Sequence, residues 1–288
     1  MHSLSRCTPV LFLGLLLLPA ALPAETVAIS SKVFNGYARA QLPDGTFKPE
    51  SYVFGEGGAW TRAINDPTME KLTFVQVARV VAGPLAKVNY HPALTSADAG
   101  LLILVFWGST QGSSSNDSSM SLDRAASALS NYNLVKPADP SVPVDTKSPE
   151  GAAMDAALWQ LSVANGERDD LDERNARILG YTEALDRARF TQHMAMGHDV
   201  LQELGDNHYF IVLKAYDFPT ALKEKKLKLM WLARLSVAEN RDFAQALEKM
   251  AASGARYFGK DSDGLLRRRA GSVDLAPMKV LEVVPDKK

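Results

Sequence analysis

The sequence predicts an α/β fold, a mixed β-sheet with helices packed on it, with an α+β arrangement as the alternative. The main observation is that residues 101–107 are apolar without a break and are bounded by glycines, which is typical of a central strand covered on both faces. Apolar residues at helical spacing precede this run over 66–87. Strand-like runs return over 209–216 and 227–237.

The first 24 residues have the features of a secretory signal peptide. Arg6 supplies the positive charge, residues 10–18 form a nearly continuous apolar run, and Ala24 offers a small-residue cleavage site before Glu25. The run is too short for a hydrocarbon core of roughly 30 Å, which needs ~20 apolar residues. We therefore expect export to the periplasm, the cell envelope or the extracellular space. After cleavage we expect no transmembrane segment.

Cysteine usage limits both the chemistry and the anchoring of the exported chain. The only cysteine is Cys7, which precedes the apolar run, whereas a lipoprotein attachment site would follow it. The processed chain then has no thiol for disulfides, metal ligation or nucleophilic attack. We expect residues 25–288 to form one domain that is stabilised by its core, because a chain of this length buries most of its surface.

The charge balance gives no sign of an anionic partner. Loss of Arg6 with the signal leaves 31 of the 32 basic residues against 33 acidic ones, a formal charge of −2. This value argues against nucleic acid or an anionic membrane surface as the partner. The densest basic run, Arg267-Arg268-Arg269, is interpreted as a solvated turn.

The first half of the chain predicts three strands and one helix, at about 27–38, 52–54 and 101–107 for the strands and 66–87 for the helix. The glycines at 55–58 are expected to end the second strand, and Pro84 to disturb the last turn of the helix. The strand–helix–strand order suggests a right-handed crossover between parallel strands.

Residues 109–151 differ in composition, being rich in Gly, Ser, Asn, Asp and Pro. We expect one long exposed polar loop here, with a short helix near 122–129. A loop of this length is either functional or disordered.

The second half predicts further helices and strands. The helices are expected at 152–165, 169–204 and 242–253, and the strands at 209–216, 227–237 and 278–284. Apolar residues alternate with more polar ones within 227–237, which predicts a strand with one more solvent-exposed face.

Four residues at the end of the central strand are candidates for a ligand site: Trp107, Ser109, Thr110 and Gln111. Ligands of α/β folds bind at this edge of the sheet. The glycine spacing around Thr110 is that of a nucleophile elbow with threonine in the serine position, but an elbow leads directly into a helix. The other interpretation is a strand end followed by a loop.

No metal or cofactor site is expected. His193 and His198 are five residues apart, whereas zinc-binding pairs on a helix are four apart, and His91 and His208 lie in other segments. The acids at 169–173 lack the alternation of a calcium loop and suit the first turn of a helix.

Part of the chain resembles a class of bacterial envelope proteins of unassigned function. The resemblance rests on the run from Ala97-Asp98 to Trp107-Gly108, on residues 228–231 with Trp231, and on the helix at 243–250. It covers about 55–110 and 208–255. Many members of the class are lipoproteins, but this chain lacks their cysteine. The resemblance implies an envelope protein with a signal peptide and lends no catalytic residue.

These observations favour an exported, non-catalytic protein of the cell envelope with a binding or structural role, whose partner could be another envelope protein. The absence of a catalytic motif and of thiols motivates this hypothesis. The alternative is a secreted or periplasmic hydrolase with its site near residues 107–112, at the carboxyl end of the central strand.

Overall fold

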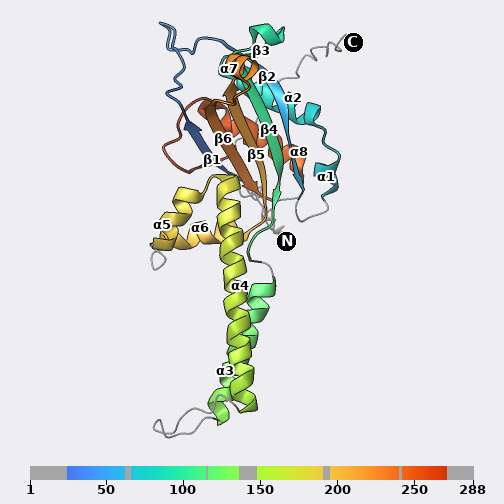
Figure 1. Ribbon diagram of the computed structural model, residues 1–288, viewed down its shortest axis with the longest axis vertical. Helices are drawn as coiled ribbons and strands as arrows, with labels where there is room; N and C mark the ends of the chain where they lie inside the picture. The colour runs from blue at the N-terminus through green and yellow to red at the C-terminus, as the bar shows by residue number, and fades with distance from the viewer. Residues whose placement is uncertain are drawn as a thin grey trace, which may run out of the picture.

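The computed structural model describes residues 25–61, 66–114, 116–135, 148–190, 195–239 and 242–270. In this part of the chain, a sheet with helices on both faces carries a long helical projection (Figure 1). The predicted mixed α/β sheet is confirmed. The expected signal peptide, the expected strand at 278–284 and His193 lie outside the described residues.

Seven strands form one sheet in the order β3-β2-β4-β5-β6-β1-β7. They are β1 (Thr26–Val33), β2 (Glu50–Thr61), β3 (Tyr90–Pro92), β4 (Leu101–Thr110), β5 (His208–Asp217), β6 (Leu229–Ala238) and β7 (Leu266–Arg269). The pairs β2–β3 and β2–β4 are parallel, and the other pairs are antiparallel. The expected parallel pairing across the first crossover is confirmed.

The α-helices of the described segments are α1 (Pro67–Glu70), α2 (Phe74–Lys87), α3 (Asn116–Val135), α4 (Pro149–Leu179), α5 (Thr182–Phe190), α6 (Ala195–Gly205), α7 (Phe218–Glu224) and α8 (Phe243–Gly254). Short 3₁₀ turns occupy Ser96–Asp98 and Ala255–Tyr257. No described helix is long and apolar enough to cross a bilayer.

Both faces of the sheet carry a hydrophobic core. The first face, with Val105 and Trp107 of β4, packs against α2 and α8. The second face, with Phe106 and Val212, packs against the end of α4 and against α5 and α6. Val105 is fully buried on the first face, whereas Leu102, Leu104 and Phe106 on the second face are only partly buried, so the cover that the unbroken apolar run predicts is incomplete on that face.

Two local expectations in the first half are wrong. β2 does not end at the glycines but continues to Thr61, with an irregularity between Glu56 and Gly58. These glycines serve packing, because a Cβ at Gly57 would lie 2.7 Å from the Phe106 ring. The helix expected at 66–87 is divided into α1 and α2 by residues 71–73, and α2 continues to Lys87 as expected, with Pro84 inside it. A capping box between Thr73 and Gln76 closes the other end of this helix.

The long polar loop expected at 109–151 is largely helical in its described part. The helix is not short but spans Asn116–Val135, and it packs along α4. Ser148 caps α4 and Pro149 occupies its first turn, an arrangement that favours helix initiation. The two helices project from the sheet domain (Figure 1). We call this pair, residues 116–135 and 149–179, the stalk.

The helices expected at 152–165 and 169–204 are also divided differently. α4 runs without a break through 166–168 and ends at Gly180, which has a left-handed φ of 86°. A residue in this conformation is the usual end of a helix. α5 and α6 then follow as shorter helices that pack against each other.

Candidate functional site

The structure does not gather the four predicted ligand residues into one pocket. Trp107 and Ser109 lie on the first face, where Trp107 is buried in the core, and Thr110 points to the second face. Gln111 is exposed, and its carbonyl accepts a 2.7 Å hydrogen bond from Asn175. The buried hydroxyls of Ser109 and Thr110 have no hydrogen-bond partner among the described residues. A hydrolytic nucleophile needs a general base within hydrogen-bonding distance of its hydroxyl, and neither residue has one among the described residues.

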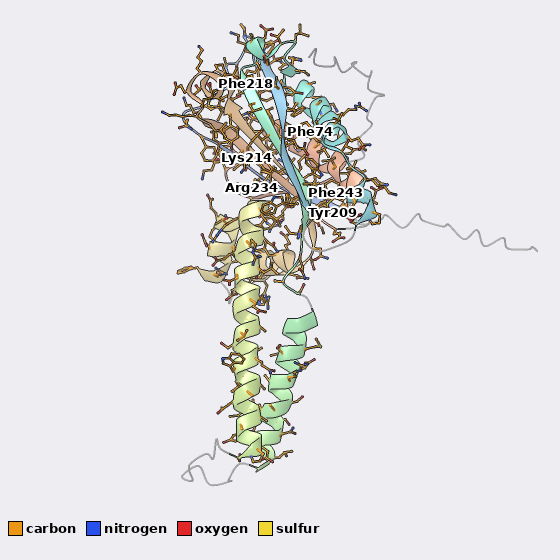
Figure 2. All side chains as sticks on the ribbon, turned by 45° about the vertical axis from the view of Figure 1, so that its right-hand side comes forward. Phe74, Tyr209, Lys214, Phe218, Arg234 and Phe243 are labelled. Carbon is orange, nitrogen blue, oxygen red and sulfur yellow. The ribbon has the colours of Figure 1, made fainter. Side chains whose placement is uncertain are left out.

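A different set of residues lines a groove of about 210 Å³ on the second face of the sheet, where the stalk meets it. Its lining residues are Trp60, Phe106, Arg177, Ile178, Phe210, Val212, Lys214 and Arg234. We call this feature the sheet groove. Figure 2 shows Lys214 and Arg234 close to the inner end of α4, and Phe74 and Phe243 on the other side of the sheet.

The aromatic floor of the groove depends on two glycines. Gly57 leaves room for the Phe106 ring to lie over β2. A Cβ at Gly108 would collide with the backbone of Trp60, so Gly108 lets β2 and β4 approach closely at this point. Trp60 is 44% exposed, whereas Phe210 behind it is buried. The floor therefore offers aromatic surface to solvent.

The end of α4 forms one wall. Gly180 allows this end to lie directly on the sheet, because a Cβ there would be 2.5 Å from Ser30 and 3.0 Å from the Arg234 stem. Arg177 and Ile178 thereby reach the groove. The Arg177 guanidinium is exposed and lies 3.2 Å from Glu173, which also binds Arg189 at 2.8 Å. Arg177 is therefore a partly neutralised cation.

Lys214 and Arg234 are the other two cations. The Lys214 ammonium lies 4.8 Å from the centre of the Phe106 ring, a cation–π contact. Arg234 is partly buried between Val212 and Ser30, and no described carboxylate pairs with it or with Lys214. Burial lowers the pKa of Arg234, but a guanidinium stays charged in proteins. Its positive charge is thus left without a counter-ion in this part of the chain.

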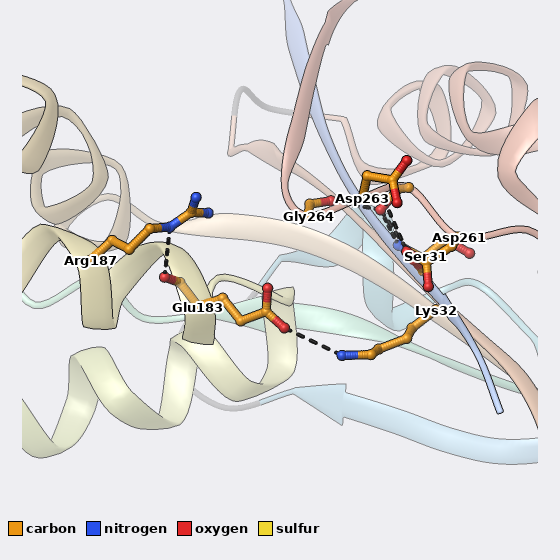
Figure 3. A network of polar contacts seen from close by, with 8 residues as sticks. Ser31, Lys32, Glu183, Arg187, Asp261, Asp263 and Gly264 are labelled. Atoms are coloured by element: carbon orange, nitrogen blue, oxygen red, sulfur yellow. Dashed lines mark hydrogen bonds and ion pairs between the residues drawn. The ribbon is translucent and has the colours of Figure 1, made fainter.

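Arg234 also lines a second, polar cavity of about 400 Å³. Figure 3 shows the contacts at this cavity, where Lys32 lies 3.3 Å from Glu183 and the Arg187 side chain donates to the Glu183 carbonyl. Of the three acids of this cavity, Glu183 pairs with Lys32 and Asp261 accepts from the backbone of Asp263, and none of the three pairs with Arg234 within the described residues.

The stalk presents the other unusual surface. Its inner seam is built largely from small residues, with Ala125 and Tyr132 of α3 and Gly151 and Ala157 of α4 buried. Seven large apolar side chains of the two helices instead face solvent. They are Met120, Leu122, Leu129, Leu134, Leu158, Trp159 and Val163, each more than 40% exposed.

The outer part of the stalk has little charge. Residues 125–135 and 156–166 contain no charged side chain. Over 116–135 and 149–166 the single cation, Arg124, is outnumbered by four acids. Interfacial membrane helices usually carry lysines and arginines on their polar face. The composition therefore suits a protein partner better than an anionic membrane.

The described histidines occupy separate places. His91 is exposed on β3, His198 lies on α6, and His208 is buried at the start of β5. Burial lowers the pKa of His208, and its hydrogen bond to the Asp206 carbonyl opposes this effect. Within the described segments, no group of three or more metal-binding side chains comes together.

Sequence reasoning missed both surfaces. One signal was available for the sheet groove, because Lys214 and Arg234 each interrupt an otherwise apolar strand. A charged side chain on a buried face of a strand costs free energy unless an opposite charge pairs with it. The sequence signal for the stalk was weaker: Leu122 and Leu129 are one heptad apart in an otherwise polar segment.

The chain matches no protein-family model, and it shows no significant similarity to a curated protein.

Proposed function

We propose that this chain is an exported, non-catalytic protein of the cell envelope that assembles through its stalk, with a second copy of itself as the partner. The observation that carries the proposal is the outward-facing set of large apolar side chains on α3 and α4. Exposed apolar patches of this kind are typical of interaction sites. The features of residues 1–24 support export.

A second stalk is the occupant that best suits this surface. Two hairpins laid side by side make a four-helix arrangement, in which apolar positions of both hairpins are buried. The charge-free stretches at 125–135 and 156–166 would meet without repulsion. A standard interface involves about 20–30 residues a side, so the seven exposed apolar side chains would form the centre of a contact that also includes their polar neighbours on both helices. A symmetric pair also closes on itself and leaves no free copy of the patch.

The molar mass in solution tests the assembly. We expect light scattering coupled to size-exclusion chromatography to find a dimer for the native chain and a monomer for Leu134→Glu/Trp159→Glu, which places charges at the two most exposed large apolar positions of the stalk. Leu94→Glu is the matched control, because Leu94 is 98% exposed and lies outside the stalk. A native chain that stays monomeric at micromolar concentration, or a double variant that remains dimeric, would refute self-assembly.

Export has its own test. The mass of the protein purified from its host should correspond to a chain that begins at Glu25. An intact Met1 would contradict export without bearing on the stalk.

A further inference from the structure

The sheet groove contains a partly buried cation without a counter-ion, and that is the observation to explain. Arg234 lies on β6 and points to the second face of the sheet. Its neighbours on the adjacent strands, Val212 and Ser30, carry no charge. A desolvated charge costs free energy unless an opposite charge approaches it. Lys214, two positions beyond Val212 on β5, adds a second unpaired cation to the same groove.

We propose that the sheet groove binds a small organic acid that joins one aromatic ring to a carboxylate. The carboxylate would pair with the fork of the Arg234 guanidinium and with the Lys214 ammonium, and the ring would lie on Trp60 and Phe106. The inference is independent of whether the stalk self-assembles.

The charged residues of the groove indicate that its ligand is an anion. Its three charged lining residues are all cations: Arg177, Lys214 and Arg234. The nearest acid on the stalk side, Glu173, is already held by Arg177 and Arg189. The acids of the adjoining cavity, Glu183, Asp261 and Asp263, lie beyond Arg234 and outside the groove lining. An anion in the groove therefore meets opposite charge.

The aromatic floor and the volume of the groove indicate the apolar part and the size of the ligand. Trp60, Phe106 and Phe210 provide aromatic surface, on which a ring packs with a gain beyond its buried area. The groove volume of about 210 Å³ is below the ~300–1,000 Å³ of sites for drug-sized ligands. It therefore suits a single ring with a short acidic arm. An arginine fork favours a carboxylate through two parallel hydrogen bonds.

Matched probes separate these contributions. We expect isothermal titration calorimetry to detect saturable binding of phenylacetate, and much weaker binding of phenylacetamide, which lacks the charge, and of acetate, which lacks the ring. N-acetyl-phenylalanine presents the same ring and carboxylate as a peptide C-terminus does. Tighter binding of this probe than of phenylacetate would identify a peptide end as the source of the acid. Weaker binding would identify a free metabolite.

Substitutions then place the ligand in the groove. Arg234→Gln should weaken phenylacetate binding about tenfold or more, as expected for the loss of a charge-assisted hydrogen bond. Lys214→Gln should weaken it less. Arg269→Gln and Lys228→Gln are the matched controls, since both side chains are exposed and lie outside the groove. Quenching of tryptophan fluorescence by the ligand should disappear in Trp60→Phe.

The outcomes decide the proposal. Equal affinity for acid and amide, or unchanged affinity in both groove variants when their circular dichroism matches the native chain, would overturn it. So would the absence of saturable binding of both aromatic acids up to about 10 mM, a limit weaker than most specific binding. Because the two groove substitutions are independent, a folding failure of one leaves the other to decide.

Discussion

The Tyr209 hydroxyl donates a 2.5 Å hydrogen bond to the Asp66 carboxylate across 143 positions of sequence. Both groups are buried. Asp66 also accepts from the backbone and the side chain of Thr68, and it caps α1. This single carboxylate therefore ties the start of α1 to the first face of the sheet through β5.

Removal of the Tyr209 hydroxyl should destabilise the fold. We expect Tyr209→Phe to lower the free energy of unfolding by about 2 kcal/mol, the range for a hydrogen bond to a charged group. Urea denaturation measures the change. Tyr216→Phe is the control, because the Tyr216 hydroxyl has no hydrogen bond in the described part of the chain, and its loss should change little. Equal effects of the two substitutions would contradict the role of the Asp66 contact.

The same contact predicts a dependence on acid pH. Burial raises the pKa of Asp66, but the hydrogen bonds from Tyr209 and Thr68 outweigh burial and leave this pKa below its usual value. A lowered carboxyl pKa stabilises the fold above the unfolded value of about 3.9, and the contribution is lost as the pH falls through the folded pKa. The stability difference between the native chain and Tyr209→Phe should therefore shrink below pH ~4.

His208 should make the fold sensitive to mild acid. Because burial lowers its pKa, the unfolded chain takes up a proton first. Stability should then fall as the pH decreases below about 6.5, the pKa of an unperturbed histidine. Melting temperatures between pH 7.5 and 5.5 should decline more steeply for the native chain than for His208→Gln. His91→Gln, at an exposed position, should keep the native slope, and a shared slope for all three chains would refute the assignment.

Alanine substitution of two glycines, one inside α4 and one at its C-cap, should change stability in opposite directions. Gly180 has a positive φ and faces Ser30 at close range, so Gly180→Ala should lower the free energy of unfolding by more than about 1 kcal/mol. Gly166 lies within the helix and has open space around it, so Gly166→Ala should raise helix stability by up to about 1 kcal/mol. Thermal unfolding followed by circular dichroism measures both. A stabilising Gly180→Ala would mean that α4 does not end on the sheet as described.

The parts that the sequence predicts well are those with a strong apolar pattern. The unbroken run of β4 and the helical spacing of α2 are sufficient to predict the parallel crossover, because burial on both faces leaves few other arrangements. The stalk is different. Its helices are stabilised by contact with each other, and their serines and asparagines favour turns and helix caps when each residue is considered alone.

The sheet groove could not be predicted from local patterns. Trp60, Phe106, Arg177 and Arg234 come from β2, β4, α4 and β6, and only the strand order brings them together. The predicted site at Ser109 and Thr110 failed to gather for a related reason. Alternation along a strand sends consecutive side chains to opposite faces, so neighbours in sequence are separated by the sheet.

The unbroken course of α4 has a mechanical consequence. At ~1.5 Å per residue its 31 residues span about 46 Å, from the outer end of the stalk to the wall of the sheet groove. Trp159 lies in the outer half of this helix, and Arg177 and Ile178 lie at its inner end. A helix of this length acts as a lever, so a tilt imposed at one end displaces the other. If a partner bound to the outer part of the stalk changes the affinity of the groove for its ligand, thermodynamic linkage requires the ligand to change the affinity for that partner by the same factor.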